Sequence, residues 1–183
     1  EGSTALENGT KYLILDLGGG TVDVTVHEIN AEGALQEVHR ATGGCWGGAT
    51  VDDEFRQLIA HVFGGNVLEQ ACRRYPNEVL DLFLEFEMKK RTFESNQTAS
   101  VPLKCPVCLF ETYKEINGAT IQENFGTSSD SAKDLVEFKR DKIIIFATTF
   151  KRLFENSISQ IIHHVNGLLH TAPVTGVTTI LMV

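Results

Sequence analysis

Apolar and polar positions in the early part of the chain alternate as they do in a sheet. A buried-looking strand over residues 11–17 runs into three consecutive glycines, after which threonine or aspartate alternates with valine at a period of two. A turn at residues 30–33 leads to a third strand over residues 34–42. The pattern predicts a β-meander whose first hairpin, residues 11–17 against 21–28, turns at the glycines.

Helical spacing follows a glycine-rich corner at residues 43–48. Apolar side chains recur every three or four residues over 51–63, and a second helix is predicted over 67–74 before Pro76 interrupts it. A longer helix then begins at Pro76. Its apolar face consists of Val79, Leu82, Phe83 and Phe86.

The next part of the chain has a mixed pattern. Residues 99–116 alternate well enough for one or two strands, and residues 117–131, rich in Gly, Ser, Thr and Asn, are the best candidate for a loop or hairpin tip. Strand character returns over residues 136–146. This segment predicts a small β-rich insertion.

A final long helix and a strand end the pattern. Thr148 or Thr149 can cap the helix, and the apolar segment 178–183 reads as a strand. We expect the apolar stripe of the helix to be core. The stripe consists of Phe150, Leu153, Phe154, Ile158, Ile161, Ile162, Val165, Leu168 and Leu169. The fold class is therefore α/β, a β-meander with packed helices plus a smaller α+β part.

Composition narrows the function classes. With 183 residues, of which 42% are hydrophobic, the chain can bury a sizeable core as one domain or two small subdomains. The net charge of −8 argues against a nucleic-acid partner, since such surfaces are rich in Lys and Arg. No apolar run approaches the length of a membrane span. We expect no membrane partner and a cytoplasmic location.

The cysteines and histidines offer weak metal signals. Cys105 and Cys108 have metal-knuckle spacing, but Cys45 and Cys72 lie far away in unlike contexts. We expect reduced, structural cysteines of a cytosolic protein, with a zinc site as the alternative. The adjacent histidines His163 and His164 lack a third metal ligand, which favours a surface or packing role for them.

The glycine turn is the strongest chemical signal. Gly18, Gly19 and Gly20 can adopt positive φ and point successive backbone N–H groups into one anion-binding concavity. Asp16 and Asp23 flank the turn with hard oxygen ligands for Mg²⁺ or its waters. A Walker A loop would need a Gly-Lys-Ser/Thr ending, and a Rossmann fingerprint would need glycine at position 23 and a following helix. The alternative is an ordinary glycine-rich hairpin.

Three stretches resemble one family. Asp16-Leu-Gly-Gly-Gly-Thr-Val-Asp-Val is similar to the second phosphate loop of the actin-like ATPase domain in the seventy-kilodalton heat-shock proteins. Trp46-Gly-Gly-Ala-Thr-Val-Asp resembles that family's Leu-Gly-Gly-Glu-Asp-Phe-Asp segment, and Glu87-Met-Lys-Lys-Arg-Thr-Phe-Glu resembles its adenosine-gripping helix. The segment from His39 to Trp46 and the short helices look most like the divergent subfamily called heat-shock protein twelve.

The resemblance implies one half of a two-lobed domain. The chain would be lobe II, with a core subdomain at about 10–65 and 147–183 and an outer subdomain at about 66–146. The first lobe, which in the family supplies another phosphate loop and a lysine acting on the γ-phosphate, would be its partner. Without that lobe we expect weak nucleotide binding and negligible hydrolysis from these residues alone.

The resemblance also implies roles in ATP hydrolysis with Mg²⁺. Asp16 would orient metal-bound or nucleophilic water, Asp23 would support the hydrated metal, and the Thr21 hydroxyl would reach the γ-phosphate or attacking water. The β- and γ-phosphates would be held by the amides of Gly18, Gly19, Gly20 and Thr21.

Further residues would hold the adenosine. Glu87 resembles the acceptor of the ribose hydroxyls, and Lys90 and Arg91 resemble the cations beside adenine; their spacing places all three on one helix face. The alternative for the two cations is a solvated helix end. The corner residues Gly47 and Gly48 belong to the same implied site. Two departures bear on nucleotide selectivity: Glu94 replaces a serine that touches adenine, and residues 49–50 replace an acidic pair.

Three functions remain open. The first is the ATP/ADP-binding lobe of a chaperone-like, stress-response ATPase with protein clients or co-chaperones. The second is a nucleotide-sensing scaffold without useful turnover. The third is a sugar or acetate kinase relative on the same fold, which should show an acceptor-substrate pocket.

Overall fold

The computed structural model describes residues 8–127 and 131–183. The chain divides into two compact units. Unit 1 consists of Glu1–Val51, described from residue 8, and Glu155–Val183; unit 2 consists of Asp52–Phe154. The subdomain boundaries expected near residues 65 and 146 stay a prediction.

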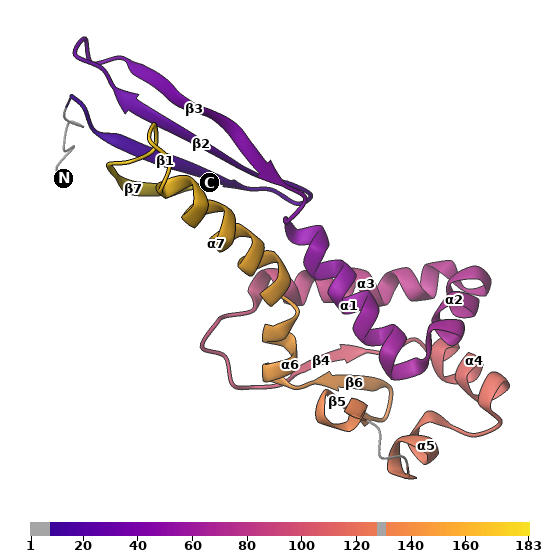
Figure 1. Ribbon diagram of the computed structural model, residues 1–183. Coiled ribbons are helices and arrows are strands. Elements are labelled where there is room, and N and C mark those ends of the chain that lie inside the picture. Colours follow the sequence, from indigo (N-terminus) through magenta and orange to yellow (C-terminus); the bar gives the residue numbers. More distant parts are fainter. Residues whose placement is uncertain (1–7, 128–130) are drawn as a thin grey trace. The chain divides into compact units, whose positions relative to one another are not determined.

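Unit 1 is built on a four-stranded sheet with the order β3-β2-β1-β7 (Figure 1). β1 (Lys11–Leu17) pairs antiparallel with β2 (Val22–Ile29), which pairs antiparallel with β3 (Leu35–Gly44). β7 (Val177–Met182) joins β1 in parallel. The predicted hairpin, the meander and the terminal strand are confirmed.

One face of this sheet packs against α7 (Glu155–Leu169). The period-two pattern turns alternate leucines and valines of β1 and β2 toward the helix, which contributes Val165 and Leu168. Ile158 and Ile162, at 49% and 54% exposed, do not belong to this core. The expectation that the whole stripe is core is therefore wrong at these two positions. The buried cluster is Leu13, Leu15, Val22, Val24, Val26, Val165, Leu168 and Val174.

The predicted final long helix is two helices. α6 (Ala147–Arg152) ends before α7 begins at Glu155. Phe146 precedes the first helical residue and makes no side-chain capping hydrogen bond. Thr148 and Thr149 lie inside α6, so the capping prediction is wrong.

Unit 2 combines helices with a three-stranded sheet of order β4-β6-β5 (Figure 1). The helices predicted in this unit and the strand character expected over residues 136–146 are confirmed. The elements are α1 (Gly48–Phe63), whose first residues up to Val51 belong to unit 1, α2 (Gly65–Arg74), α3 (Pro76–Thr92), β4 (Val101–Lys104), α4 (Val107–Asn117), α5 (Ile121–Thr127), a 3₁₀ turn (Ser131–Asp134), β5 (Val136–Lys139), β6 (Lys142–Ile145) and α6.

Two sequence predictions in this unit are wrong. The expected strands over residues 99–116 reduce to β4, because Val107–Asn117 is helix α4. Its buried residues Cys108, Leu109 and Thr112 share one helical face. Helix α5 lies within the segment expected to be a loop, of which residues 128–130 lie outside the described residues.

Stacked phenylalanines hold α3 in place. The ring centroids of Phe55 on α1 and Phe86 on α3 are 3.9 Å apart with nearly parallel planes, and Phe150 of α6 lies 5.5 Å from Phe86. All three side chains are fully buried. Burying one such ring stabilises a fold by roughly 1.5–3 kcal/mol. This packing fixes the C-terminal half of α3, which carries Glu87, Lys90 and Arg91.

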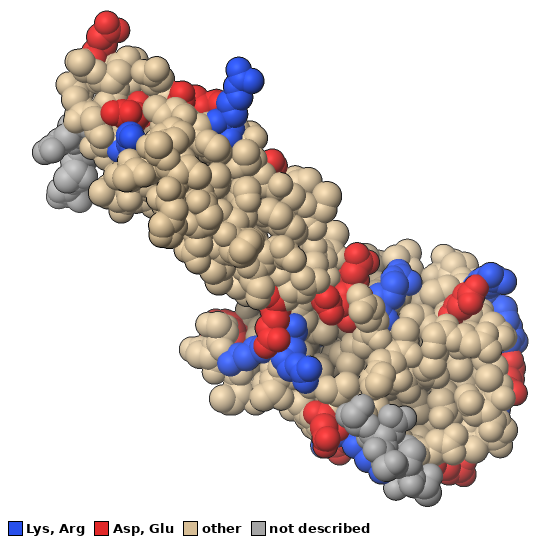
Figure 2. Space-filling model, viewed as in Figure 1, with Lys and Arg blue, Asp and Glu red and all other residues tan. Residues whose placement is uncertain are grey.

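Charged side chains of both signs lie on the surface of each unit (Figure 2). Within the described residues, no helix combines the length and the apolar character needed to cross a membrane.

Candidate functional site

The turn between β1 and β2 brings the two flanking aspartates together. The ladder continues to Leu17 opposite Val22 and places Asp16 directly opposite Asp23. Both side chains are exposed, and neither makes an ion pair within the described part of the chain. Like charges directly opposite each other destabilise a sheet. The arrangement therefore favours a cation at the end of the hairpin.

The start of α1 holds the turn through the carbonyl groups of its glycines. The amides of Gly47, Gly48 and Ala49 donate to the carbonyl oxygens of Gly20, Gly18 and Gly19, at 3.3, 3.3 and 2.7 Å. The turn's own amides, from residue 18 to Thr21, donate to no backbone carbonyl among the described residues. They are therefore available to an anion.

The glycines serve this turn in a way that the sequence did not predict. None of Gly18, Gly19 and Gly20 has a positive φ, so the expected left-handed turn is wrong. A Cβ on Gly18 would stand 2.8 Å from the Thr21 carbonyl oxygen, and one on Gly47 would stand 2.4 Å from the Gly18 carbonyl oxygen. A Cβ on Gly19 or Gly20 would meet nothing within 4 Å. Gly18 and Gly47 must therefore be glycine because the neighbouring backbone is too close for a Cβ, whereas Gly19 and Gly20 leave room for an approaching group.

Thr21 connects the turn to one of the aspartates. Its hydroxyl group donates to Asp23 Oδ2 at 3.3 Å. This contact holds the exposed Thr21 hydroxyl beside the carboxylates of the facing residues Asp16 and Asp23.

The corner before α1 has support that sequence reasoning missed. The Ser157 hydroxyl donates to the Trp46 carbonyl oxygen at 2.5 Å, and the His164 ring lies 5.1 Å from the Trp46 ring. His164 Nε2 also lies 3.0 Å from Thr42 Oγ1, a packing role as expected. At Gly43 a Cβ would stand 1.8 Å from the Val22 carbonyl oxygen. The double glycine before the tryptophan was the available signal for this tight approach.

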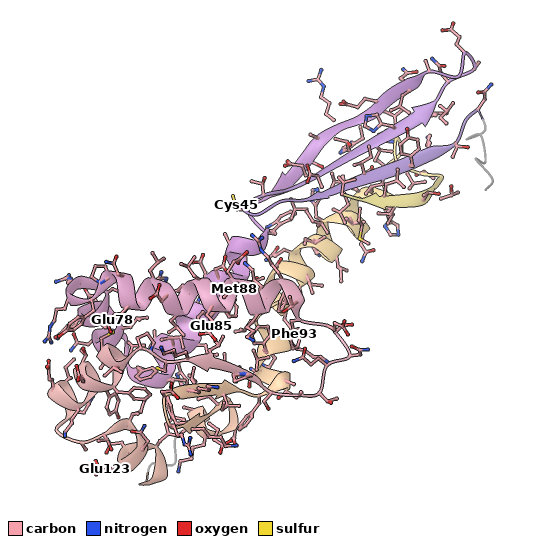
Figure 3. The ribbon with its side chains drawn as sticks, turned by 180° about the vertical axis from the view of Figure 1, so that it is seen from behind. Cys45, Glu78, Glu85, Met88, Phe93 and Glu123 are labelled. Atoms are coloured by element: carbon pink, nitrogen blue, oxygen red, sulfur yellow. The ribbon has the colours of Figure 1, made fainter. Side chains whose placement is uncertain are left out.

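A network of ion pairs occupies the end of α3, near the labelled Met88 in Figure 3. Lys90 Nζ lies 2.7 Å from Asp52 Oδ1 and also contacts Glu87, while Arg91 Nε lies 2.7 Å from Glu87 Oε1. The Lys90 side chain is only 10% exposed, whereas that of Arg91 is 76% exposed. Hydrogen bonds from Lys90 and then Arg91 lower the pKa of Glu87 below its ordinary value. Glu87 thus contacts both predicted cations, Lys90 and Arg91.

A pocket of about 320 Å³ lies beside this network, between α1 and α3. The Arg56 guanidinium lies over the Phe83 ring, 4.5 Å from its centroid. Sequence reasoning did not select Asp52, Arg56 or Phe83 as site residues, because the contacts join positions far apart in the chain. The lining is Asp52, Asp53, Arg56, Phe83, Leu84 and Glu87.

The predicted site residues fall into two groups. The turn, its aspartates and the corner glycines lie in unit 1, and Glu87, Lys90 and Arg91 lie in unit 2. Each group is brought together within its own unit. Glu94 lies beyond the end of α3 and is exposed.

The four cysteines are free thiols, and Cys105 and Cys108 are buried. Burial raises the pKa of the Cys105 thiol, and burial together with Glu78 raises that of Cys108 to about 12. No set of three or more His, Cys, Asp or Glu side chains suited to a metal ion occurs among the described residues. Two carboxylates are nevertheless enough for Mg²⁺, which usually keeps several waters and adds phosphate oxygens as ligands. Asp16 and Asp23 fit that donor set.

The chain is similar to heat shock 70 kDa protein 12. It is 33% identical over 180 residues to the 12A proteins of Mus musculus and Homo sapiens, and 29% identical to 12B of Homo sapiens. These alignments cover 97% of this chain and 26% of each relative, so the chain spans about a quarter of their length. No protein-family model matches the chain. The resemblance to the heat-shock protein twelve subfamily is confirmed, and the assignment to lobe II stays a prediction.

Proposed function

From this similarity to heat shock 70 kDa protein 12, we propose that the chain is lobe II of an actin-like nucleotide-binding domain and holds the phosphates of ATP or ADP. The observation that carries the proposal is the turn at residues 18–21. Its carbonyl groups are bound by the start of α1, its amides have no backbone acceptor among the described residues, and two of its glycines leave open space. Such a turn is suited to a phosphate group.

Phosphoryl transfer requires positioning and charge stabilisation more than covalent chemistry from the protein. Asp16 and Asp23 would hold a hydrated Mg²⁺, which supplies neutralisation of the charge on the β- and γ-phosphates when bound. Asp16 would orient the attacking water. The Thr21 hydroxyl, beside Asp23, would contact the γ-phosphate or that water.

Unit 2 would hold the nucleoside. Glu87 would accept the ribose hydroxyls, while Lys90 and Arg91 would lie beside adenine. The paired charges support this role because they fix the Glu87 carboxylate and the nearly buried Lys90 in defined positions. Within the full-length protein, the first lobe, protein clients and co-chaperones would be partners in the cytoplasm.

A nucleotide-sensing scaffold is the second candidate. Glu94 and the neutral residues at 49–50 depart from the chaperone pattern at positions that bear on nucleotide selectivity. Kinetics separate the two functions, since a scaffold binds nucleotide without useful hydrolysis.

The test uses Asp16→Asn in the full-length protein, with equilibrium Mg-ATP binding and single-turnover hydrolysis as readouts. We expect the rate to fall by two to three decades, equivalent to about 3–4 kcal/mol, while the dissociation constant changes far less. Glu32→Gln, at an exposed turn of the same unit, is the matched control and should change neither. Absence of turnover by the unmodified protein would favour the scaffold, and an unchanged rate in Asp16→Asn would contradict the assigned role.

A further inference from the structure

The sheet of unit 2 carries three lysines in register. Lys104 of β4 lies directly opposite Lys142 of β6, which in turn lies opposite Lys139 of β5. Directly opposite residues project from the same face of a sheet. These three side chains, here called the lysine row, therefore cross the outer face of the sheet, and Arg140 follows in the hairpin turn.

The lysine row is exposed and only partly neutralised. Lys139 pairs with Glu137 at 3.1 Å between Nζ and Oε2. Lys104, Arg140 and Lys142 make no ion pair within the part of the chain that the structure describes. Like charges directly opposite each other weaken strand pairing. An anionic partner would relieve this repulsion, in a chain whose overall net charge is −8.

An apolar pair lies next to the lysine row. Pro102 of β4 is directly opposite Ile144 of β6, on the same outer face. A hollow of about 650 Å³ joins this pair to Lys139, Arg140 and Lys142. Its lining is Pro102, Lys139, Arg140, Asp141, Lys142 and Ile144. The face thus offers an apolar contact beside a cationic strip.

We propose that this face docks an acidic segment of a partner protein, with carboxylates on the lysine row and an apolar side chain against Pro102 and Ile144. Charge complementarity requires an anionic partner. The carboxylates of Glu137 and Asp141 and the acidic chain as a whole would repel the dense charge of a nucleic acid more strongly than the sparser charge of a short acidic peptide with apolar residues. The interaction is independent of the nucleotide site proposed above.

The test is fluorescence anisotropy with the full-length protein and a short fluorescent peptide of alternating aspartate and leucine. The variant Lys104→Glu/Lys142→Glu reverses two charges of the row. The control Lys114→Glu/Lys151→Glu makes the same charge change at exposed positions on α4 and α6. We expect binding that weakens with salt, a loss of at least about tenfold in the row variant and about twofold or less in the control.

Two companion probes test the apolar part of the face. A peptide with alanine in place of leucine should bind several-fold more weakly, and a single-stranded RNA of equal length should bind more weakly than the leucine peptide. Equal losses in both double variants, tighter binding of the RNA, no effect of removing leucine or no peptide binding at all would each overturn the proposal. Circular dichroism of the variants checks that the fold is retained, and Mg-ATP binding should be unchanged in the row variant.

Discussion

Single alanine substitutions in the glycine turn separate its ligand-binding role from its structural role. At Gly19 a Cβ would meet no protein atom within 4 Å, so Gly19→Ala should change the free energy of unfolding by no more than about 0.5 kcal/mol. The same Cβ would occupy the space through which we propose that a phosphate approaches. Displacing one charge-assisted hydrogen bond costs about 1.5–3 kcal/mol, so Mg-ATP should bind roughly 10- to 100-fold more weakly.

Gly47→Ala should behave differently because its Cβ would stand 2.4 Å from the Gly18 carbonyl oxygen and 2.9 Å from the carbonyl carbon and oxygen of Gly19. The backbone of the turn would have to move, and overpacking of this kind costs about 1–3 kcal/mol. Both stability and nucleotide binding should therefore fall.

The matched control is Gly167→Ala, at an exposed position inside α7 where a Cβ also meets nothing within 4 Å. It should stabilise the protein by about 0.5–1 kcal/mol and leave binding unchanged. Urea unfolding and calorimetric titration with Mg-ATP measure the two quantities on the full-length protein. Unaltered Mg-ATP affinity in Gly19→Ala would refute the proposed use of the open space.

Two further predictions concern the ion pairs of α3 and the thiols. Lys90→Ala should destabilise it by about 1–3 kcal/mol in urea unfolding, because two carboxylates lose a nearly buried partner, whereas exposed Arg91→Ala should cost about 0–1 kcal/mol. Because the pKa of Glu87 is lowered, the stabilisation from its ion pairs is present above the unfolded-state pKa and is lost as pH falls through the folded-state pKa. Equal losses of stability in Lys90→Ala and Arg91→Ala at neutral pH would contradict the argument from the burial of Lys90. A thiol reagent at mildly alkaline pH should label exposed Cys45 long before Cys105 and Cys108, whose raised pKa values keep them protonated; comparable rates by mass spectrometry would show that the pair is accessible.

Local patterns were enough to predict the part of the fold that carries the turn. The change from a buried run to period-two alternation around the glycines gave the β1–β2 hairpin, and Pro76 marked the start of α3. In each case the signal and the structure lie in the same short segment, where propensity and tertiary packing agree.

The errors arose where packing overrides local preference. Residues 107–117 contain Val, Phe, Thr, Tyr and Ile, which favour strands, yet burial of one face against α2 and α3 makes them a helix. Pro106 before that helix and Gly118 after it were the available boundary signals. No proline or glycine signals the break between α6 and α7, and the helical spacing of apolar residues continues through it.

The site was predicted only as far as motifs reach. The sequence selected the glycines, both aspartates and Glu87, but it could not show that Asp16 faces Asp23 or that Lys90 pairs with Asp52, because strand register and helix packing decide those contacts. The purpose of the glycines was also misjudged. The close approach of Gly18 and Gly19 to Gly47, just before α1, became visible only in three dimensions.

The central claim is that the turn at residues 18–21 binds the phosphates of a nucleotide. Calorimetric titration of the full-length protein with AMP, ADP and ATP in the presence of Mg²⁺ tests it most directly. Because the amides of the turn would contact the β- and γ-phosphates, ADP and ATP should bind at least about tenfold more tightly than AMP. AMP binding as tight as that of ADP, or no binding of any of the three, would contradict the account.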